Sequence, residues 1–208
     1  MATAEAFWDN TAQKYAKSKV GDEKAYAVTL ERVRAHLNPA DRVFELGGGT
    51  GTTAVKLHRA VEHYVMSDVS TKMREIAEQR AKEAGANNIE IVEADTRAVG
   101  KRSETFDAVL AFNLLHLLPD VPRVLTDVRE ILKPDGLFIS KTPCLGGRPM
   151  IRGFVGALKM IGKAPPHVGF LSPDEVEQMQ RDAGFEIIER GDYPPKWPSR
   201  FTVARRMG

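Results

Sequence analysis

The fold of this chain is decided by the stretch Val43-Phe44-Glu45-Leu46-Gly47-Gly48-Gly49-Thr50-Gly51. A short apolar segment with one acid runs into four glycines in five residues, and apolar residues at helical spacing resume at Ala54. This pattern predicts a strand, a tight turn and a helix. Glycine can adopt positive φ and lets a ligand approach the main chain, while the start of a helix presents unpaired N–H groups. We therefore expect a ligand to bind against this backbone.

The spacing of the glycines separates two classes of nucleotide site. A dinucleotide turn has the pattern G-x-G-x-x-G, and counting from Gly47 places Thr52 where the third glycine belongs. The glycines here follow the pattern E-x-G-x-G-x-G from Glu45. A nicotinamide-dependent oxidoreductase is therefore the less favoured class.

Strand-like and helix-like segments alternate along the rest of the chain, with short connections. This order predicts an α/β fold with a doubly wound, mostly parallel sheet. A turn is expected at residues 133–136, between a helix and the fifth strand. The predicted strands after the glycine turn are 64–68, 89–95, 106–112, 137–142, 185–190 and 200–205.

Two acids end successive predicted strands. Asp68 lies about twenty residues beyond the glycines, where such folds place a carboxylate that accepts both ribose hydroxyls. Its alternative role is to cap the following helix, but Ser70 already stands at that position. Asp95 ends the next strand and could accept a hydrogen bond from an adenine amino group, or it is a solvated loop acid.

Polar residues also follow the buried strand 106–112. Ligands of open parallel sheets bind outside the carboxyl ends of the strands, so Asn113 and His116 are placed to reach the ligand. A neutral imidazole at His116 could take a proton from the substrate. The alternative is a half-buried histidine with no catalytic role.

Residues 1–38 form two predicted helices ahead of the first strand, and we expect them to lie over the strand ends as a lid. Tyr15 or Tyr26 could close on the ligand from this lid, or these aromatic side chains could simply pack the helices down. Residues 144–171 interrupt the alternation and form an expected substrate-side insertion. Its apolar segment 150–163, edged with Arg and Lys, could line a pocket, rest on a membrane surface, or be an ordinary packed helix.

The composition sets limits on the class of protein. At 208 residues and 42% hydrophobic content, the chain is long enough for one substantial core, so we expect a single domain over residues 1–208. The net charge of +2 gives little attraction for nucleic acid, and none is expected as a partner. One cysteine and five scattered histidines predict no metal site. The absence of an apolar signal core or spanning run predicts a soluble, cytoplasmic protein.

Five motifs together resemble the class I S-adenosylmethionine-dependent methyltransferases, from the glycine turn through the fifth strand. The N-terminal Phe7-Trp8-Asp9 with Tyr15 is similar to the small-molecule and lipid branch, which includes quinone-biosynthesis enzymes. The resemblance implies a Rossmann-like, seven-stranded sheet with its last strand antiparallel, plus the N-terminal lid helices. The five motifs are Glu45-Leu46-Gly47-Gly48-Gly49-Thr50-Gly51, Ser67-Asp68-Val69-Ser70 with Met73, Glu93-Ala94-Asp95, Asn113-Leu114-Leu115-His116 and Leu132-Lys133-Pro134-Asp135-Gly136-Leu137.

The resemblance also implies which residues bind the cofactor, S-adenosyl-L-methionine. The glycines would hold its methionine and ribose part, Asp68 its ribose hydroxyls, Asp95 with Thr96 its adenine, and the backbone of Asn113 its amine. The implied cofactor-binding set is Tyr15, Glu45, Gly47, Gly49, Gly51, Asp68, Val69, Met73, Asp95, Thr96, Asn113 and Leu114. Gly48 stands where the family often has a small side chain, which we expect to loosen the turn.

The implied reaction is methyl transfer to a small-molecule or lipid-like acceptor. A sulfonium already activates its methyl group, so alignment of the acceptor can supply about 7 to 11 kcal/mol and no strong base is obligatory. Cys144 could act as a thiolate in carbon methylation, but a structural cysteine fits better because no nucleic-acid-binding segment accompanies it. A non-catalytic sensor or accessory protein that binds the cofactor remains an alternative.

Overall fold

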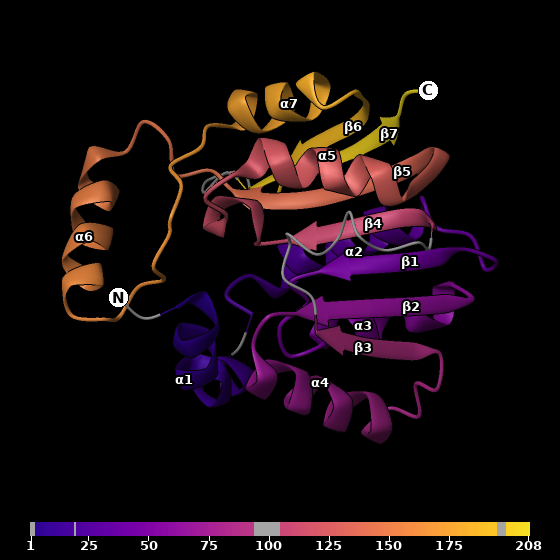
Figure 1. Cartoon of the computed structure of the whole chain (residues 1–208), viewed down its shortest axis with the longest axis horizontal. Helices are drawn as coiled ribbons and strands as arrows, with labels where there is room; N and C mark the ends of the chain where they lie inside the picture. The colour runs from indigo at the N-terminus through magenta and orange to yellow at the C-terminus, as the bar shows by residue number, and fades with distance from the viewer. Residues whose placement is uncertain (1–2, 19, 94–104, 195–198) are drawn as a thin grey trace.

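The computed structural model describes residues 3–18, 20–93, 105–194 and 199–208. Seven strands form one sheet in the order β3-β2-β1-β4-β5-β7-β6, and β7 alone runs antiparallel to its neighbours (Figure 1). The doubly wound, mostly parallel sheet predicted from the sequence is confirmed. The strands are β1 Arg42–Leu46, β2 His63–Asp68, β3 Ile89–Glu93, β4 Phe106–Phe112, β5 Leu132–Pro143, β6 Phe185–Asp192 and β7 Ser199–Arg206.

Helices cover both faces of this sheet, and each face has its own apolar core. One core joins α5 and α7 to strand residues such as Phe44 and Val109. The other joins α2, α3 and α4 to the alternate strand residues, such as Val43 and Leu110. The α-helices are α1 Ala4–Lys17, α2 Glu23–Arg34, α3 Thr52–Leu57, α4 Thr71–Glu83, α5 Val121–Ile131, α6 Pro149–Met160 and α7 Pro173–Asp182, with 3₁₀ turns η1 His58–Ala60 and η3 Leu115–Leu117.

Side-chain caps fix where most of these helices begin. Asp22, Ser70 and Asp120 each accept a hydrogen bond from the backbone N–H three residues ahead, at the start of α2, α4 and α5. Ser172 and Glu175 form a reciprocal capping box at the start of α7. The cap at Ser70 was predicted from the sequence, because capping depends on residues only three apart.

The turn predicted at residues 133–136 falls inside β5, as an irregularity of that strand. The strand pairs Phe106 with Leu132 and then Ala108 with Leu137, so five steps along β5 match two along β4. The extra residues form a bulge in which Asp135 adopts a φ of 60°. The Nζ of Lys133 donates to Oδ1 of Asp107 over 2.7 Å and holds the bulge against β4. A bulge of this size reads as a turn when only the sequence is seen.

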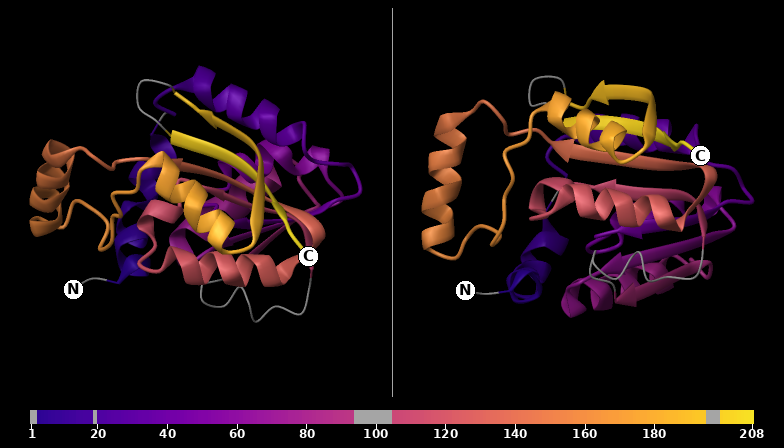
Figure 2. Two further views of the ribbon diagram at one scale, coloured as in Figure 1. Left: turned by 90° about the horizontal axis from the view of Figure 1, so that it is seen from above. Right: turned by 45° about the horizontal axis from the view of Figure 1, so that its top comes forward.

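Two helices lie beyond the carboxyl ends of β1, β2 and β4. Figures 1 and 2 show α1 and α6 at this end of the molecule, and α6 stands apart from the sheet on two connecting segments. Of the two helices expected over the strand ends, only α1 lies there. Helix α2 packs on the sheet face through the buried residues Leu30 and Val33. The part of the chain that the structure describes contains no helix long and apolar enough to span a bilayer.

Candidate cofactor-binding site

The glycine turn after β1 has the left-handed backbone that its sequence predicted. Gly47, Gly49 and Gly51 have φ values of 62°, 58° and 72°, a region that residues with a Cβ rarely adopt. A Cβ on Gly47 would lie 2.8 Å from Cδ1 of Leu114, and one on Gly51 would lie 2.8 Å from Cβ of Ala77. A Cβ on Gly49 would meet only Tyr15, at 3.9 Å. The turn is therefore closely packed at its two ends and open at its centre.

Gly48 does not loosen the turn, contrary to the expectation from the sequence. A Cβ at this position would lie 2.4 Å from Cγ of Met66 and 3.0 Å from Oε2 of Glu45. The buried side chain of Met66, on β2, already occupies the space that a small side chain would fill. The side chain of Met66, from the neighbouring strand, therefore packs where a side chain at Gly48 would lie.

Asp68 lies at the end of β2 and is bonded directly to the glycine turn. Its Oδ2 accepts a hydrogen bond from the N–H of Gly49 over 2.9 Å, and its Oδ1 accepts one from the N–H of Ser70 over 2.9 Å. Burial raises the pKa of this carboxyl, and the two N–H donors oppose the rise. Each oxygen keeps a lone pair, so the carboxylate can also accept the hydroxyls of a ribose placed over Gly49.

Glu45 lies beneath the turn and is 2% exposed. Its Oε2 accepts a hydrogen bond from the hydroxyl of Tyr64 over 2.9 Å. Burial raises the pKa of Glu45 to about 7, and the nearby negative charge of Asp68 adds to the rise. A cation bound over the turn would favour the ionised form of Glu45, so the site is suited to a positively charged ligand.

Helix α1 is fastened beside this turn at both of its ends. Near its start, Oδ1 of Asp9 accepts hydrogen bonds from the hydroxyl of Ser70 over 2.6 Å and from the N–H of Lys72 over 3.1 Å. Near its end, Arg80 of α4 donates to the carbonyl of Ala16 over 2.9 Å. The same guanidinium donates to the hydroxyl of Thr50 in the glycine turn over 2.7 Å. Arg80 thus links the position of α1 to that of the turn.

Tyr15 projects from α1 toward the centre of the turn. Tyr15 is 48% exposed, its ring contacts that of Trp8 edge to face at 6.2 Å, and its Cε1 would lie 3.9 Å from a Cβ on Gly49. Burial raises the pKa of its hydroxyl, with smaller contributions from the charges of Asp68 and Glu45. Tyr15 is therefore positioned to contact a ligand held at Gly49.

Asn113 and Leu114 bring the end of β4 to the same site. Asn113 has a φ of 54°, and its N–H donates to the carbonyl of Lys141 over 2.8 Å. Asparagine tolerates this backbone better than most residues. Its carbonyl oxygen can accept a hydrogen bond from an amine, while Leu114 packs on Gly47.

The other four predicted cofactor residues, Val69, Met73, Asp95 and Thr96, also remain predictions. Arg74 holds the carbonyls of Asp68 and Val69 over 2.8 and 3.1 Å, so the backbone of Val69 is fixed beside the site. Met73 is buried in the first turn of α4. The predictions for Asp95 and Thr96 fall outside the described residues.

His116 lies in η3, just beyond Asn113. Burial lowers its pKa to about 4, with a further contribution from the charge of His167. Its Nδ1 is buried, and no hydrogen bond to it is formed by the residues that the structure describes. Its carbonyl accepts a hydrogen bond from the N–H of Gly169 over 2.6 Å, which ties the 144–171 segment to the site. The neutral imidazole can accept a proton at neutral pH, but only as a weak base.

Sequence reasoning missed two charged residues near this edge. Arg80 was given no role from the sequence, although it holds the turn and α1. Lys141, at the end of β5, donates to the hydroxyl of Thr29 over 3.0 Å, and burial lowers its pKa. A lysine after the apolar run Leu137–Ser140 was the available signal for the second. Cys144 is buried in the core and donates to the carbonyl of Thr142 over 3.3 Å, and burial raises its pKa; these features suit a structural thiol.

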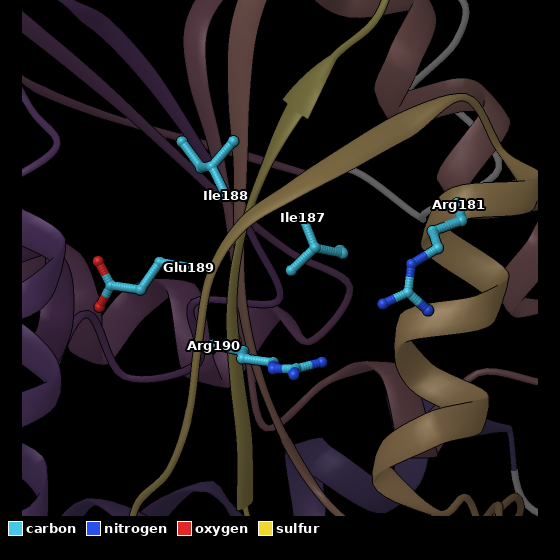
Figure 3. Close-up of a pocket in the computed structure, with 5 residues that line it drawn as sticks. All are labelled: Arg181, Ile187, Ile188, Glu189 and Arg190. Carbon is cyan, nitrogen blue, oxygen red and sulfur yellow. The ribbon is translucent and has the colours of Figure 1, made fainter.

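A hollow of about 180 Å³ at the far edge of the sheet has no part in this site (Figure 3). It is lined by β6 and α7, and Figure 3 shows Ile187 and Arg190 pointing toward Arg181 while Glu189 points to the other side. Glu189 is bound there by Arg32 of α2 and by His36, which lies just beyond the end of that helix. β6 is the edge strand, so these groups fasten the edge of the sheet to α2.

The residues around the turn fit a nucleoside that carries a positive charge. The centre of the turn is open at Gly49, the Asp68 carboxylate adjoins it, and the buried Glu45 lies below it. This set matches the needs of S-adenosylmethionine, which combines two ribose hydroxyls with a cationic methionine part. A dinucleotide site would instead require glycine at Thr52.

Comparisons with known proteins agree with this geometry. Residues 43–136 match the family described as a methyltransferase domain. The uncharacterized methyltransferase YcgJ of Bacillus subtilis is 24% identical over 202 residues, which cover 95% of this chain and 78% of that protein. The highly reducing polyketide synthase NEC1 of Pyricularia oryzae is 29% identical over 146 residues, which are 64% of this chain but 5% of the synthase. The chain thus spans a small fraction of the polyketide synthases and most of YcgJ.

Solved structures show the same fold. The crystal structure of YcgJ aligns with a TM-score of 0.72 over 90% of this chain and all of that one, at 17% identity. The magnesium protoporphyrin IX methyltransferase of Synechocystis, solved with S-adenosylhomocysteine bound, aligns with a TM-score of 0.75 over 97% of both chains, at 19% identity. Residues 43–136 thus match a methyltransferase domain family, and the chain has the fold of solved methyltransferases, one of which holds S-adenosylhomocysteine.

Proposed function

We propose that this protein transfers the methyl group of S-adenosylmethionine to a small-molecule or lipid-like acceptor at the carboxyl edge of the sheet. The observation that carries the proposal is the turn of three left-handed glycines whose central N–H is bonded to Asp68. In this proposal, Asp68 and the turn hold the cofactor, and Tyr15 covers it from α1. The acceptor reaches it from the side of the 144–171 segment.

The proposed methyl transfer does not require a strongly basic or nucleophilic side chain. S-adenosylmethionine supplies a methyl group that its sulfonium has already activated. The protein must hold the acceptor in line with that group and exclude water, and orientation of this kind contributes about 7 to 11 kcal/mol. His116 is neutral at pH 7 because its pKa is about 4. In this proposal its imidazole orients a hydroxyl or amine of the acceptor, and it accepts the proton only where the acceptor is itself acidic.

The preference for an apolar acceptor rests on the 144–171 segment. The segment is tied to the site by the hydrogen bond from Gly169 to His116. It holds many apolar residues, and Phe154 and Met160 are largely exposed. The names of two similar proteins point the same way, since one is a polyketide synthase and the other methylates magnesium protoporphyrin IX.

Transfer of labelled methyl groups tests this function. The purified protein is incubated with cofactor labelled at its methyl group and with an organic extract of cells, and the label in the organic phase is counted. We expect label to accumulate with the wild-type protein and to fall at least tenfold with Asp68→Asn. An asparagine has one oxygen, so it cannot accept hydrogen bonds from both Gly49 and Ser70.

Asp107→Asn is the matched control, because it also removes a carboxylate that accepts a backbone N–H. Asp107 lies at the opposite end of β4 and holds Arg42 and Lys133. This variant should lose stability but keep methyl transfer at low temperature. Saturable binding of the cofactor without label in any lipophilic or water-soluble acceptor would contradict the proposed transfer and favour a sensor.

A further inference from the structure

Helix α6 presents apolar side chains to solvent over most of its circumference. None of its residues is buried. Ile151, Val155 and Leu158 share one face and are half-buried. A second face, at spacing i, i+4, i+7 and i+11, holds Met150 and Phe154, which are 88% and 66% exposed, followed by Ala157 and Ile161. An ordinary packed helix would expose a polar face instead.

All charged side chains in the segment around α6 are positively charged. Residues 136–173 contain no Asp or Glu, although the whole chain has nearly equal numbers of acids and bases. The segment includes five of the 30 Lys and Arg residues, so the rest of the chain is net acidic. Lys159 and Lys163 flank the exposed apolar face at one end of α6, and Arg152 stacks on the ring of Phe170 at 4.9 Å.

We propose that α6 is a docking surface for an anionic lipid bilayer. Exposed large apolar side chains flanked by Lys and Arg are the features with which interfacial helices enter the headgroup region and attract anionic lipids. A second copy of the chain fits less well, because two helices of the same positive charge would repel each other. Figures 1 and 2 show α6 standing off the body of the protein, so its outer face can meet a flat surface.

Docking of this kind would also orient the catalytic edge. The segment that carries α6 is bonded to η3 through Gly169 and His116, next to the ends of the strands that form the cofactor site. A bilayer on the outer face of α6 would therefore lie on the side from which the acceptor arrives. The docking itself does not depend on the proposed methyl transfer.

Flotation of the full chain with vesicles tests the surface. We expect the protein to float with vesicles of phosphatidylcholine and phosphatidylglycerol at low salt, and to float much less with phosphatidylcholine alone. Phe154→Glu should weaken partitioning at least tenfold, because it replaces an aromatic anchor by a charge. Lys159→Glu should weaken it at least fivefold, since each basic residue near an anionic surface contributes about 1 kcal/mol.

Two matched controls separate a local surface from a general effect. Met207→Glu places the same charge at an exposed apolar residue elsewhere, and Lys82→Glu makes the same charge reversal on α4. Both should float like the wild-type protein. Phe154→Trp adds a reporter whose fluorescence should shift to the blue on vesicles and stay unchanged without them.

Binding of S-adenosylhomocysteine is measured on every variant and should be unchanged by the α6 substitutions. Equal flotation of wild type and Phe154→Glu would overturn the proposed surface, even where the cofactor binds normally. The same holds if the wild-type protein stays unbound on anionic vesicles at low salt while light scattering shows a dimer that Phe154→Glu dissociates. Loss of cofactor binding in the wild-type protein would instead contradict the proposed function and leave the flotation result to stand alone.

Discussion

Binding of S-adenosylmethionine should release a proton from Glu45. This carboxyl is buried beneath the glycine turn, and its pKa is raised to about 7, first by burial and then by the charge of Asp68. The cofactor brings positive charge to the turn, which favours the ionised carboxylate and lowers its pKa. Binding and deprotonation of Glu45 are therefore linked.

The size of the effect follows from the pKa. At pH 6, one unit below the pKa, about 90% of Glu45 is protonated in the free protein, so binding should release about 0.9 proton; at pH 8 it should release about 0.1. Affinity should increase with pH, because the cofactor binds more tightly to the protein with ionised Glu45. Affinity should rise nearly tenfold per pH unit up to about pH 7 and then level off.

Calorimetry measures this release directly. Titrations at pH 6 in two buffers of different ionisation enthalpy give the number of protons from the difference in observed heat. Glu45→Gln is the control, because its amide oxygen can still accept the hydroxyl of Tyr64 while the titrating group is gone. The variant should release no proton and bind with the same affinity at pH 6 and pH 8. Equal proton release by the wild-type protein and the variant would refute the role assigned to Glu45.

Three further predictions concern the packing, protonation and fastening of the site. Gly48→Ala should destabilise the protein by about 1 to 3 kcal/mol in urea unfolding, because its Cβ would lie 2.4 Å from Met66, and an equal cost in a Met66→Ala background would contradict this. His116 has a pKa of about 4 when folded and an ordinary value of 6.5, so it binds a proton more readily when unfolded. Stability should therefore fall by up to about 3 kcal/mol between pH 6.5 and pH 4 relative to His116→Leu, and parallel stability curves would disprove the shift. Arg80→Ala should raise amide hydrogen exchange in α1 by about tenfold, because the carbonyl of Ala16 loses its donor; unchanged exchange would show that α1 is held elsewhere.

The parts of the site that the sequence predicted are those set by short-range backbone chemistry. Three glycines at alternate positions can form this turn because each adopts positive φ at little cost. Asp68 was predicted because it ends the strand 64–68, about twenty residues beyond the glycines. The order of segments predicted the mostly parallel sheet, and the family resemblance implied the antiparallel last strand.

The parts that the sequence did not predict depend on contacts between distant residues. Met66 fills the space at Gly48 from the neighbouring strand, and only the folded register brings the two together. Lys133 and Asp107 hold a bulge whose sequence is typical of a turn. Arg80 lies on an apolar stripe, and its role follows from the position of α1. Such pairings have no local signature.

The most direct test of the account is the binding of S-adenosylhomocysteine to the wild-type protein, Asp68→Ala and Asp107→Asn. The wild-type protein should bind saturably at one site, and Asp107→Asn should bind with unchanged affinity. Asp68→Ala should lose at least a hundredfold in affinity, since hydrogen bonds to a charged group contribute about 1.5 to 3 kcal/mol each. Equal affinity of Asp68→Ala and the wild-type protein would contradict the placement of the nucleoside over the glycine turn.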